Sequence, residues 1–347
     1  MITRFVFSLT AFLSASSFAA ESTGPKLYPT IGEIIRVDAK LDSLLPADAK
    51  IEVIGSGFDW CEGPVWVPAT KDGEGGYLLF SEIPSNSVRR WSEDQDAVSI
   101  FLQPSGYTGL GKYSGEPGCN GLVLNAAGEL LSCEHGDRRI SLLTKNGGKR
   151  TLTDNWNGKR LNSPNDLTLK SNGDVYFTDP IYGLPEKDKD PSREIDVCGV
   201  YRYSIKDKTT TLLTDVLTRP NGIAFSPDEK TLYVAQSDPK AAIWMSFPVK
   251  EDGTLGAGKL LKDVTEMSKQ PGVKGLPDGM KVDAKGNLWA TGPGGVHIMA
   301  PDGTLLGRID TKQSTSNCTF GGPQGTTLYM TVDMYICRVE TKVKGSR

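Results

Sequence analysis

The sequence has little of what many catalytic and metal sites are made from. Only two histidines, His135 and His297, occur in 347 residues, so a Ser-His-Asp triad has few ways to form. The six cysteines contain no C-x-x-C pair, which removes support for zinc ribbons and thiol redox chemistry. The G-x-S-x-G, H-E-x-x-H and P-loop motifs are also absent, so these motifs give no guide to function.

The chain also lacks an excess of charge and a long apolar segment. Lys and Arg number 39 against 42 Asp and Glu, without a basic stripe, which argues against a nucleic-acid partner. No apolar run reaches the 18 or so residues of a membrane span. Residues 1–20 resemble a secretory signal, with Arg4, an apolar stretch from Phe5 to Leu13 and small residues before Ala20.

We therefore predict a signal peptide over residues 1–20 and an exported protein, periplasmic or secreted, with no membrane anchor after cleavage. Export would permit disulfides, and six cysteines allow many pairings. Several of the cysteines lie in apolar, strand-like runs, where buried free thiols fit equally well.

Glycine is abundant, at 39 residues, which favours a turn-rich, mostly β protein. One unit recurs six times: a turn, a short apolar run, a polar turn and a second apolar run. The second runs begin at intervals of roughly 40–57 residues, the period of a propeller blade: YLLFSE (77–82), ELLSCE (129–134), DVYFTD (174–179), TLYVAQ (231–236), NLWATG (287–292) and TLYMTV (327–332).

These repeats predict an all-β protein, a six-bladed β-propeller over residues 55–342 with a lead-in over 21–54. Large aromatic side chains in the runs, such as Trp66 and Tyr329, are expected to pack between blades. The sixth unit lacks a fourth strand, and we expect the N-terminal segment Gly32 to Asp38 to supply it and close the ring. The only helical expectation is a short turn from Val264 to Lys269.

The first apolar run of five units carries an oxygen-bearing residue four positions before an apolar anchor. In a propeller the innermost strands surround the axis, so these side chains should converge. Such a set, with two carboxylates and no His or Cys, suits a hard divalent cation, and irregular geometry favours Ca²⁺ over Mg²⁺. The five residues are Glu62, Asn120, Asn165, Asn221 and Asp278.

The motifs EGPVW, CEHGDRR, SPNDLTL, RPNGIAF and PDGMKV together resemble the gluconolactonase family, which includes regucalcin. The resemblance runs from about Phe58 to Glu340. Ser163 departs from the regucalcin branch, which favours the bacterial-type gluconolactonases. The resemblance to the family implies a six-bladed propeller with one divalent ion, usually Ca²⁺, in an axial pocket.

Residue by residue, the resemblance implies that Glu62, Asn165, Asn221 and Asp278 bind the metal. It also implies that Asn120 contacts substrate, that Asp166 orients a ligand from behind the metal, and that His135, Asp179 and Tyr182 line the pocket.

The resulting hypothesis is metal-assisted hydrolysis of a sugar lactone, such as glucono-1,5-lactone, by a monomer. Asp278 is the predicted catalytic residue, either as the base for water or as the nucleophile. The loops Gln103 to Gly118 and Leu184 to Asp196 are expected to rim the pocket. Two alternatives remain: hydrolysis of another lactone or a phosphoester, and a non-catalytic, calcium-stabilised sugar-binding propeller.

Overall fold

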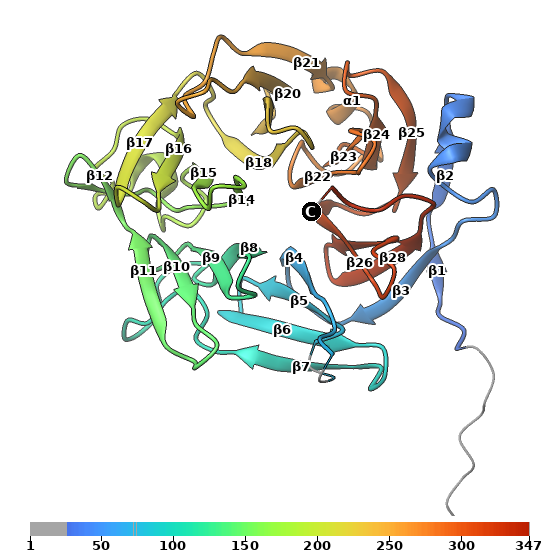
Figure 1. The fold of residues 1–347 in the computed structure, drawn as a ribbon, viewed down its shortest axis with the longest axis horizontal. Coiled ribbons are helices and arrows are strands. Elements are labelled where there is room, and N and C mark those ends of the chain that lie inside the picture. The colour runs from blue at the N-terminus through green and yellow to red at the C-terminus, as the bar shows by residue number, and fades with distance from the viewer. Residues whose placement is uncertain (1–25, 72, 74, 347) are drawn as a thin grey trace, which may run out of the picture.

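The computed structural model describes residues 26–71, 73 and 75–346, so the predicted signal peptide lies outside the described residues. Six antiparallel sheets stand around a central axis, each with its first strand innermost (Figure 1). This arrangement confirms the six-bladed β-propeller.

The first three blades follow one another along the chain, and each has four strands in sequence order. A two-stranded hairpin, β12 (Asn155–Trp156) and β13 (Lys159–Arg160), lies between the second and third blades in sequence. The strands of the three blades are β4 (Cys61–Val67), β5 (Tyr77–Glu82), β6 (Ser87–Ser92) and β7 (Ala97–Leu102); β8 (Cys119–Leu124), β9 (Leu130–Glu134), β10 (Arg139–Leu143) and β11 (Lys149–Thr153); β14 (Leu167–Leu169), β15 (Val175–Asp179), β16 (Gly199–Ser204) and β17 (Thr209–Thr214).

The last three blades continue the pattern, and N-terminal strands enlarge the fifth and complete the sixth. The three helical segments of the described residues are short: η1 (Ala39–Ser43), η2 (Lys187–Lys189) and α1 (Thr265–Ser268), the last inside the predicted turn. The strands are β18 (Pro220–Phe225), β19 (Thr231–Asp238), β20 (Ala241–Pro248) and β21 (Lys259–Asp263); β22 (Met280–Val282), β23 (Leu288–Gly292), β24 (Gly295–Met299) and β25 (Leu305–Asp310); β26 (Thr315–Gly321), β27 (Thr327–Val332) and β28 (Tyr335–Glu340).

An N-terminal strand closes the ring, as predicted, but the predicted segment was wrong. The fourth strand of blade six is β3 (Ile51–Ser56), antiparallel to β28, with β1 (Thr30–Ile31) outside it. The segment 32–38 instead contains β2 (Glu33–Arg36), a fifth strand on the outer edge of blade five beside β25. Burial explains the difference, because β3 places Ile51 and Ile54 in the core, whereas β2 has no fully buried residue.

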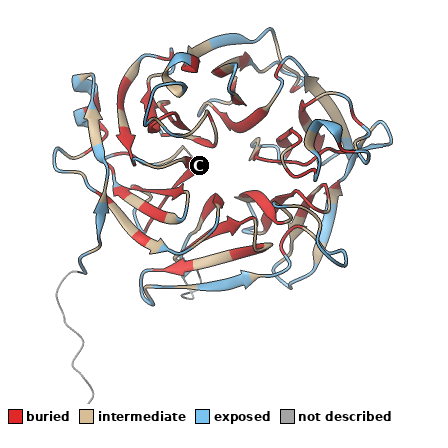
Figure 2. Cartoon of the chain, turned by 180° about the vertical axis from the view of Figure 1, so that it is seen from behind, coloured by how far each residue is buried: buried red, intermediate tan, exposed pale blue. Residues whose placement is uncertain are grey.

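The core lies between the blades. Figure 2 shows buried residues concentrated on the inner strands and exposed residues on the outermost ones. The aromatic residues of the repeats pack across neighbouring blades, as predicted: Trp66 stacks on Tyr329 with ring centroids 5.3 Å apart, and Tyr176 meets Phe225 edge to face at 4.8 Å. Such pairs add about 0.5–1.5 kcal/mol each beyond the area that they bury.

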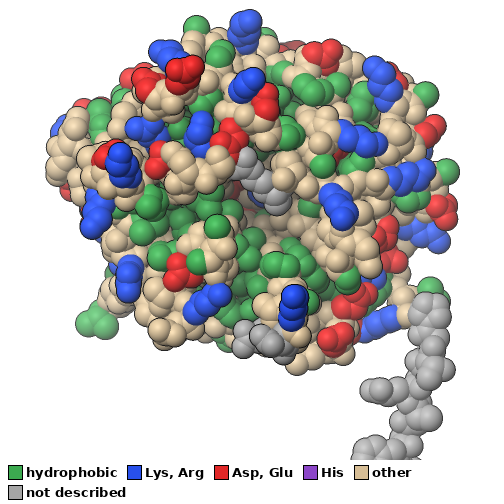
Figure 3. Space-filling view, in the orientation of Figure 1, with side chains coloured by type: hydrophobic (Ala, Val, Ile, Leu, Met, Phe, Trp, Pro, Cys, Tyr) green, Lys and Arg blue, Asp and Glu red, His purple; other side chains and the backbone are tan. Residues whose placement is uncertain are grey.

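On the face shown in Figure 3, basic and acidic side chains are interspersed.

The C-terminal segment lies near the axis in Figure 1 and pairs with blade five through a bridge between Gly345 and Asp283. No helix in the described part of the chain has the length and apolar character to cross a membrane.

All six cysteines are buried free thiols in this structure, so of the two alternatives left open by the sequence, the thiol form is the one observed.

Candidate active site

A cavity of about 510 Å³ opens where the innermost strands begin, and it has the size of a small-molecule site. All five residues predicted to converge line it: Glu62, Asn120, Asn165, Asn221 and Asp278. Glu62, Asn120 and Asn221 are the second residues of β4, β8 and β18, and Asn165 and Asp278 lie two residues before the starts of β14 and β22.

The inner strands lose regular pairing where these residues occur. The register shifts between Glu62 and Val65 and between Pro220 and Ile223, so the side chains are released toward the axis. A glycine follows four of the five residues, all except Asn165, and permits this because neighbouring backbones nearly touch. A Cβ on Gly63 would lie 2.0 Å from the Asn120 carbonyl oxygen, and Gly63 has φ +47°.

Hydrogen bonds orient the Asn221 amide. Its Nδ2 donates to the Ser237 hydroxyl oxygen at 3.0 Å, and that hydroxyl donates to the Pro277 carbonyl. Because the amide nitrogen is used in this way, the Asn221 Oδ1 is left as an acceptor for the site.

Several buried polar atoms of the cavity have no partner. The Oδ1 atoms of Asn120 and Asp278 and the hydroxyl of Tyr182 make no hydrogen bond, although all three residues line the cavity. An unsatisfied buried polar group destabilises a fold by about 1–3 kcal/mol. These atoms are therefore available to bind a ligand at the ring.

The carboxyl groups at the axis repel one another. Burial, and then the charge of Asp166, raises the pKa of Glu62 to about 8. Burial, and then the charges of Glu62 and Asp166, raises the pKa of Asp278 well above its usual range. Burial also raises the pKa of Asp166, while the nearby Lys281 ammonium opposes the rise. Without a cation, these groups favour their protonated forms.

The residues present fit a hard cation. Two carboxylates balance a divalent charge, and the amide oxygens complete an oxygen-only set of the kind that Ca²⁺ accepts. No cluster of three or more His, Cys, Asp or Glu with metal-binding potential occurs in the described ranges. The candidate ligands are instead a mixed set of Glu62 and Asp278 with Asn165 and Asn221.

The other predicted residues occupy three different places. Tyr182 lines the cavity, and burial followed by the charge of Asp278 raises its pKa. Asp166 lies outside the lining, where Asn317 Nδ2 contacts its Oδ2 at 3.4 Å. His135 is fully buried and does not line the cavity. Its Nδ1 is 3.6 Å from Oε2 of Glu116, and Glu116 does line the cavity.

Asp179 is also buried away from the lining. Its carboxylate accepts the backbone N–H groups of Asn162 and Ser163, each at 2.8 Å. Asp179 therefore fixes the segment just before Asn165, which places Asn165 in the cavity wall.

The sequence profile of the family described as the SMP-30/Gluconolactonase/LRE-like region matches residues 60–333. The chain belongs to this family. A gluconolactonase of Zymomonas mobilis is 40% identical to this family member over 343 residues, which cover 97% of this chain and 93% of the relative. A pentonolactonase of Haloferax volcanii is 31% identical, covering 78% and 80% of the two chains.

A solved structure extends the similarity to three dimensions. A gluconolactonase of Xanthomonas campestris superimposes on this family member with a TM-score of 0.76 and 31% identity, covering 93% of this chain and 99% of the other. The resemblance inferred from the motifs is confirmed.

Some cavity residues of this gluconolactonase-family chain were missed by the sequence reasoning. Glu116 lies in one of the two loops expected at the rim, but it was not singled out. The end of α1 and the segment after it, represented by Ser268, Lys269 and Leu276, were not expected at the rim at all. Asn317 of blade six lies outside the lining, where it contacts Asp166, and it escaped the pattern because Gly321, four residues later, is not an apolar anchor.

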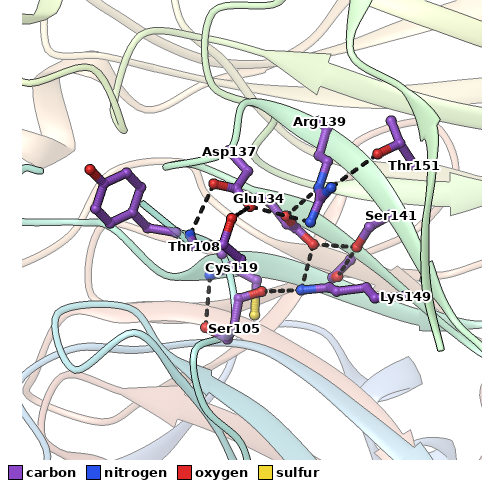
Figure 4. Close-up of polar contacts among 12 residues, drawn as sticks. Ser105, Thr108, Cys119, Glu134, Asp137, Arg139, Ser141, Lys149 and Thr151 are labelled. Carbon is purple, nitrogen blue, oxygen red and sulfur yellow. Dashed lines mark hydrogen bonds and ion pairs between the residues drawn. The ribbon is translucent and has the colours of Figure 1, made fainter. Parts of the chain in front are cut away.

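A polar network beside the site holds the loop that carries Glu116 (Figure 4). The buried Glu134 carboxylate pairs with Arg139 Nε and Lys149 Nζ, each at 2.6 Å. Lys149 also donates to the Ser105 carbonyl, and the Ser105 hydroxyl accepts the Cys119 N–H at 3.1 Å. The network thereby connects the start of this loop to the strand end next to Asn120.

Proposed function

We propose that this protein hydrolyses a sugar lactone to the aldonic acid, with a divalent cation, Ca²⁺, held at the axial ring. The observation that carries the proposal is the set of converging, unpaired oxygen atoms at the bottom of a cavity sized for a sugar. Relatives named gluconolactonase and pentonolactonase support the same reaction class.

The cation would be held by Glu62, Asn165, Asn221 and Asp278. When bound, it supplies a Lewis acid that polarises the lactone carbonyl and stabilises the negative charge developing on its oxygen.

Asp278 has the chemistry of the proton acceptor. Its Oδ1 has no partner in the protein, so it is free to accept a hydrogen bond from the attacking water and take its proton. A carboxylate beside a cation is a weak base, which suffices for a strained lactone that needs little activation. Direct attack by the Asp278 carboxylate on the carbonyl carbon is the alternative pathway.

The uncharged groups of the wall would recognise the sugar. Asn120 Oδ1 accepts a hydrogen bond from a sugar hydroxyl, and the Tyr182 hydroxyl both donates and accepts. His135 would act only through Glu116, because it is buried behind that side chain. Glucono-1,5-lactone is the first substrate to test, and pentonolactones follow from the Haloferax relative.

Location and assembly remain proposals from sequence. Residues 1–20 have the pattern of a secretory signal, so we propose that the mature protein works in the periplasm or outside the cell, as a monomer without a membrane anchor.

The test is a lactone panel, with mature protein freed of metal by chelation and then supplied with Ca²⁺. We expect turnover above the spontaneous rate that is lost with chelator and restored by Ca²⁺. Full activity in the metal-free protein would contradict the metal-assisted reaction. Sugar binding without turnover of any lactone or phosphoester would favour the binding-protein alternative.

A further inference from the structure

One carboxylate in the cavity wall, Glu116, is not part of the axial ring. It lies in the loop between β7 and β8, lines the cavity and is 36% exposed in its side chain. Its negative charge is felt at the ring, where it adds to the rise in the pKa of Glu62.

The other acids near the axis have a counter-charge available. A divalent cation balances Glu62 and Asp278, and Lys281 lies near enough to Asp166 to oppose the rise in its pKa. Glu116 is outside the proposed metal ligands. With the ring occupied, the net charge of the wall therefore depends on Glu116 and its own neighbours.

The neighbouring bases neutralise Glu116 only in part, because burial raises the pKa of Glu116 and the Lys187 ammonium opposes that rise. The His135 ring is 3.6 Å away, but burial lowers its pKa to about 3, so it is uncharged near neutral pH. Lys187 Nζ is 4.0 Å away at the exposed surface and donates to the Tyr182 carbonyl. The one basic residue among the lining, Lys269, is paired with Glu266 at 2.7 Å.

Independent observations show what the same wall accepts. Asn120 is 3% exposed, lines the cavity and has an unpaired Oδ1. The Tyr182 hydroxyl is also unpaired. These atoms match the hydroxyl groups of an uncharged sugar, whereas an anionic substituent would meet an acceptor oxygen and a negative charge.

We infer that Glu116 is a specificity-determining residue, which selects neutral sugar lactones over lactones bearing a carboxylate or phosphate and speeds release of the product. The inference rests on the proposed function. In that reaction water adds to the carbonyl carbon, the ring C–O bond breaks with a proton going to the ring oxygen, and the new carboxylic acid ionises. A neutral substrate thus becomes an anion beside Glu116.

The test compares D-glucono-1,4-lactone with D-glucaro-1,4-lactone, which carries a carboxylate in place of the terminal CH₂OH. We expect Glu116→Gln to raise the ratio of kcat/KM for the glucaro- over the gluconolactone about fivefold, the order for one partly screened charge. Inhibition by D-gluconate should strengthen to the same extent, and added salt should reduce both effects.

Two further variants control the comparison. Glu251→Gln removes an exposed carboxylate after β20, at the opposite end of the strands from the cavity, and should leave the ratio unchanged. Lys187→Met removes the cation nearest Glu116 and should lower the ratio. This second variant keeps the inference testable if Glu116→Gln does not fold.

A ratio and a gluconate inhibition constant within twofold of wild type in Glu116→Gln would overturn the inference, as would an unchanged ratio in Lys187→Met if only that variant folds. If wild type hydrolyses no lactone, the proposed function fails separately. Calorimetric binding of D-gluconate in excess Ca²⁺ then decides: tighter binding by Glu116→Gln supports the inference, and equal or absent binding refutes it.

Discussion

The buried Glu62 carboxylate should destabilise the fold whenever no cation balances it. Glu62 is 3% exposed, and its pKa is raised from 4.5 to about 8. At about 1.4 kcal/mol for each tenfold change in an ionisation constant, this difference corresponds to at most about 5 kcal/mol. Glu62→Gln removes the charge and keeps an oxygen to accept the Gly63 N–H.

The sign of the pH dependence follows from the raised pKa. Below about pH 4.5 the side chain is protonated in the folded and unfolded states, so its ionisation has no effect. As the pH rises from about 4.5 through 8, the unfolded chain ionises first, and the folded protein loses stability. In metal-free protein, Glu62→Gln should therefore be more stable than wild type by about 2–4 kcal/mol near pH 8, and nearly equal to it near pH 5.

Calcium should reduce this difference. A ligand at 100 times its Kd stabilises the folded state by about 2.7 kcal/mol, and wild type should gain this more fully than the variant. Urea unfolding followed by tryptophan fluorescence, near pH 5 and pH 8, with chelator or Ca²⁺, measures all four cases. Glu251→Gln, an exposed carboxylate, is the control. The reasoning is refuted if metal-free wild type shows no loss of stability over this pH range.

Three further predictions concern single positions. Gly63→Ala places a Cβ against the Asn120 carbonyl at positive φ and should lower the free energy of unfolding by about 3 kcal/mol or more in thermal unfolding. Gly115→Ala, with open space around it, is the control and should be tolerated. Equal losses of stability in the two variants would contradict the packing argument. Tyr182→Phe should raise KM about fivefold without loss of stability, because its hydroxyl has no partner, and an unchanged KM would remove Tyr182 from the substrate site. Asp179→Asn removes one of the two side-chain oxygens that accept backbone N–H groups and should lower the free energy of unfolding in urea by about 2–3 kcal/mol. An unfolding midpoint equal to that of wild type would contradict this prediction.

Most of the site could be predicted because it belongs to the repeat. Glu62, Asn120, Asn165, Asn221 and Asp278 occupy equivalent positions in successive blades, and rotation about one axis brings equivalent positions together. The positions of these residues in the repeat therefore predicted that their side chains converge, without any knowledge of long-range contacts.

The missed features depend on where the chain runs between repeats. The segments 32–38 and 51–56 both look like strands, and η1 between them, with Leu41 buried against blade five, directs the first to that blade and leaves the second for blade six. Glu116 lies outside the repeated strands, in the loop between β7 and β8 that connects blades one and two. Its approach to the cavity depends on tertiary contacts such as the Glu134 network (Figure 4).

The most direct test of the central claim, that the axial ring is a cation-dependent lactone-hydrolysing site, is the rate of Asp278→Asn on glucono-1,5-lactone in saturating Ca²⁺. The substitution keeps the size of the side chain but removes its charge and basicity. After subtraction of spontaneous hydrolysis, we predict a loss of about a thousandfold in kcat/KM, with a circular dichroism spectrum like that of wild type. A folded variant within tenfold of the wild-type rate would contradict the claim.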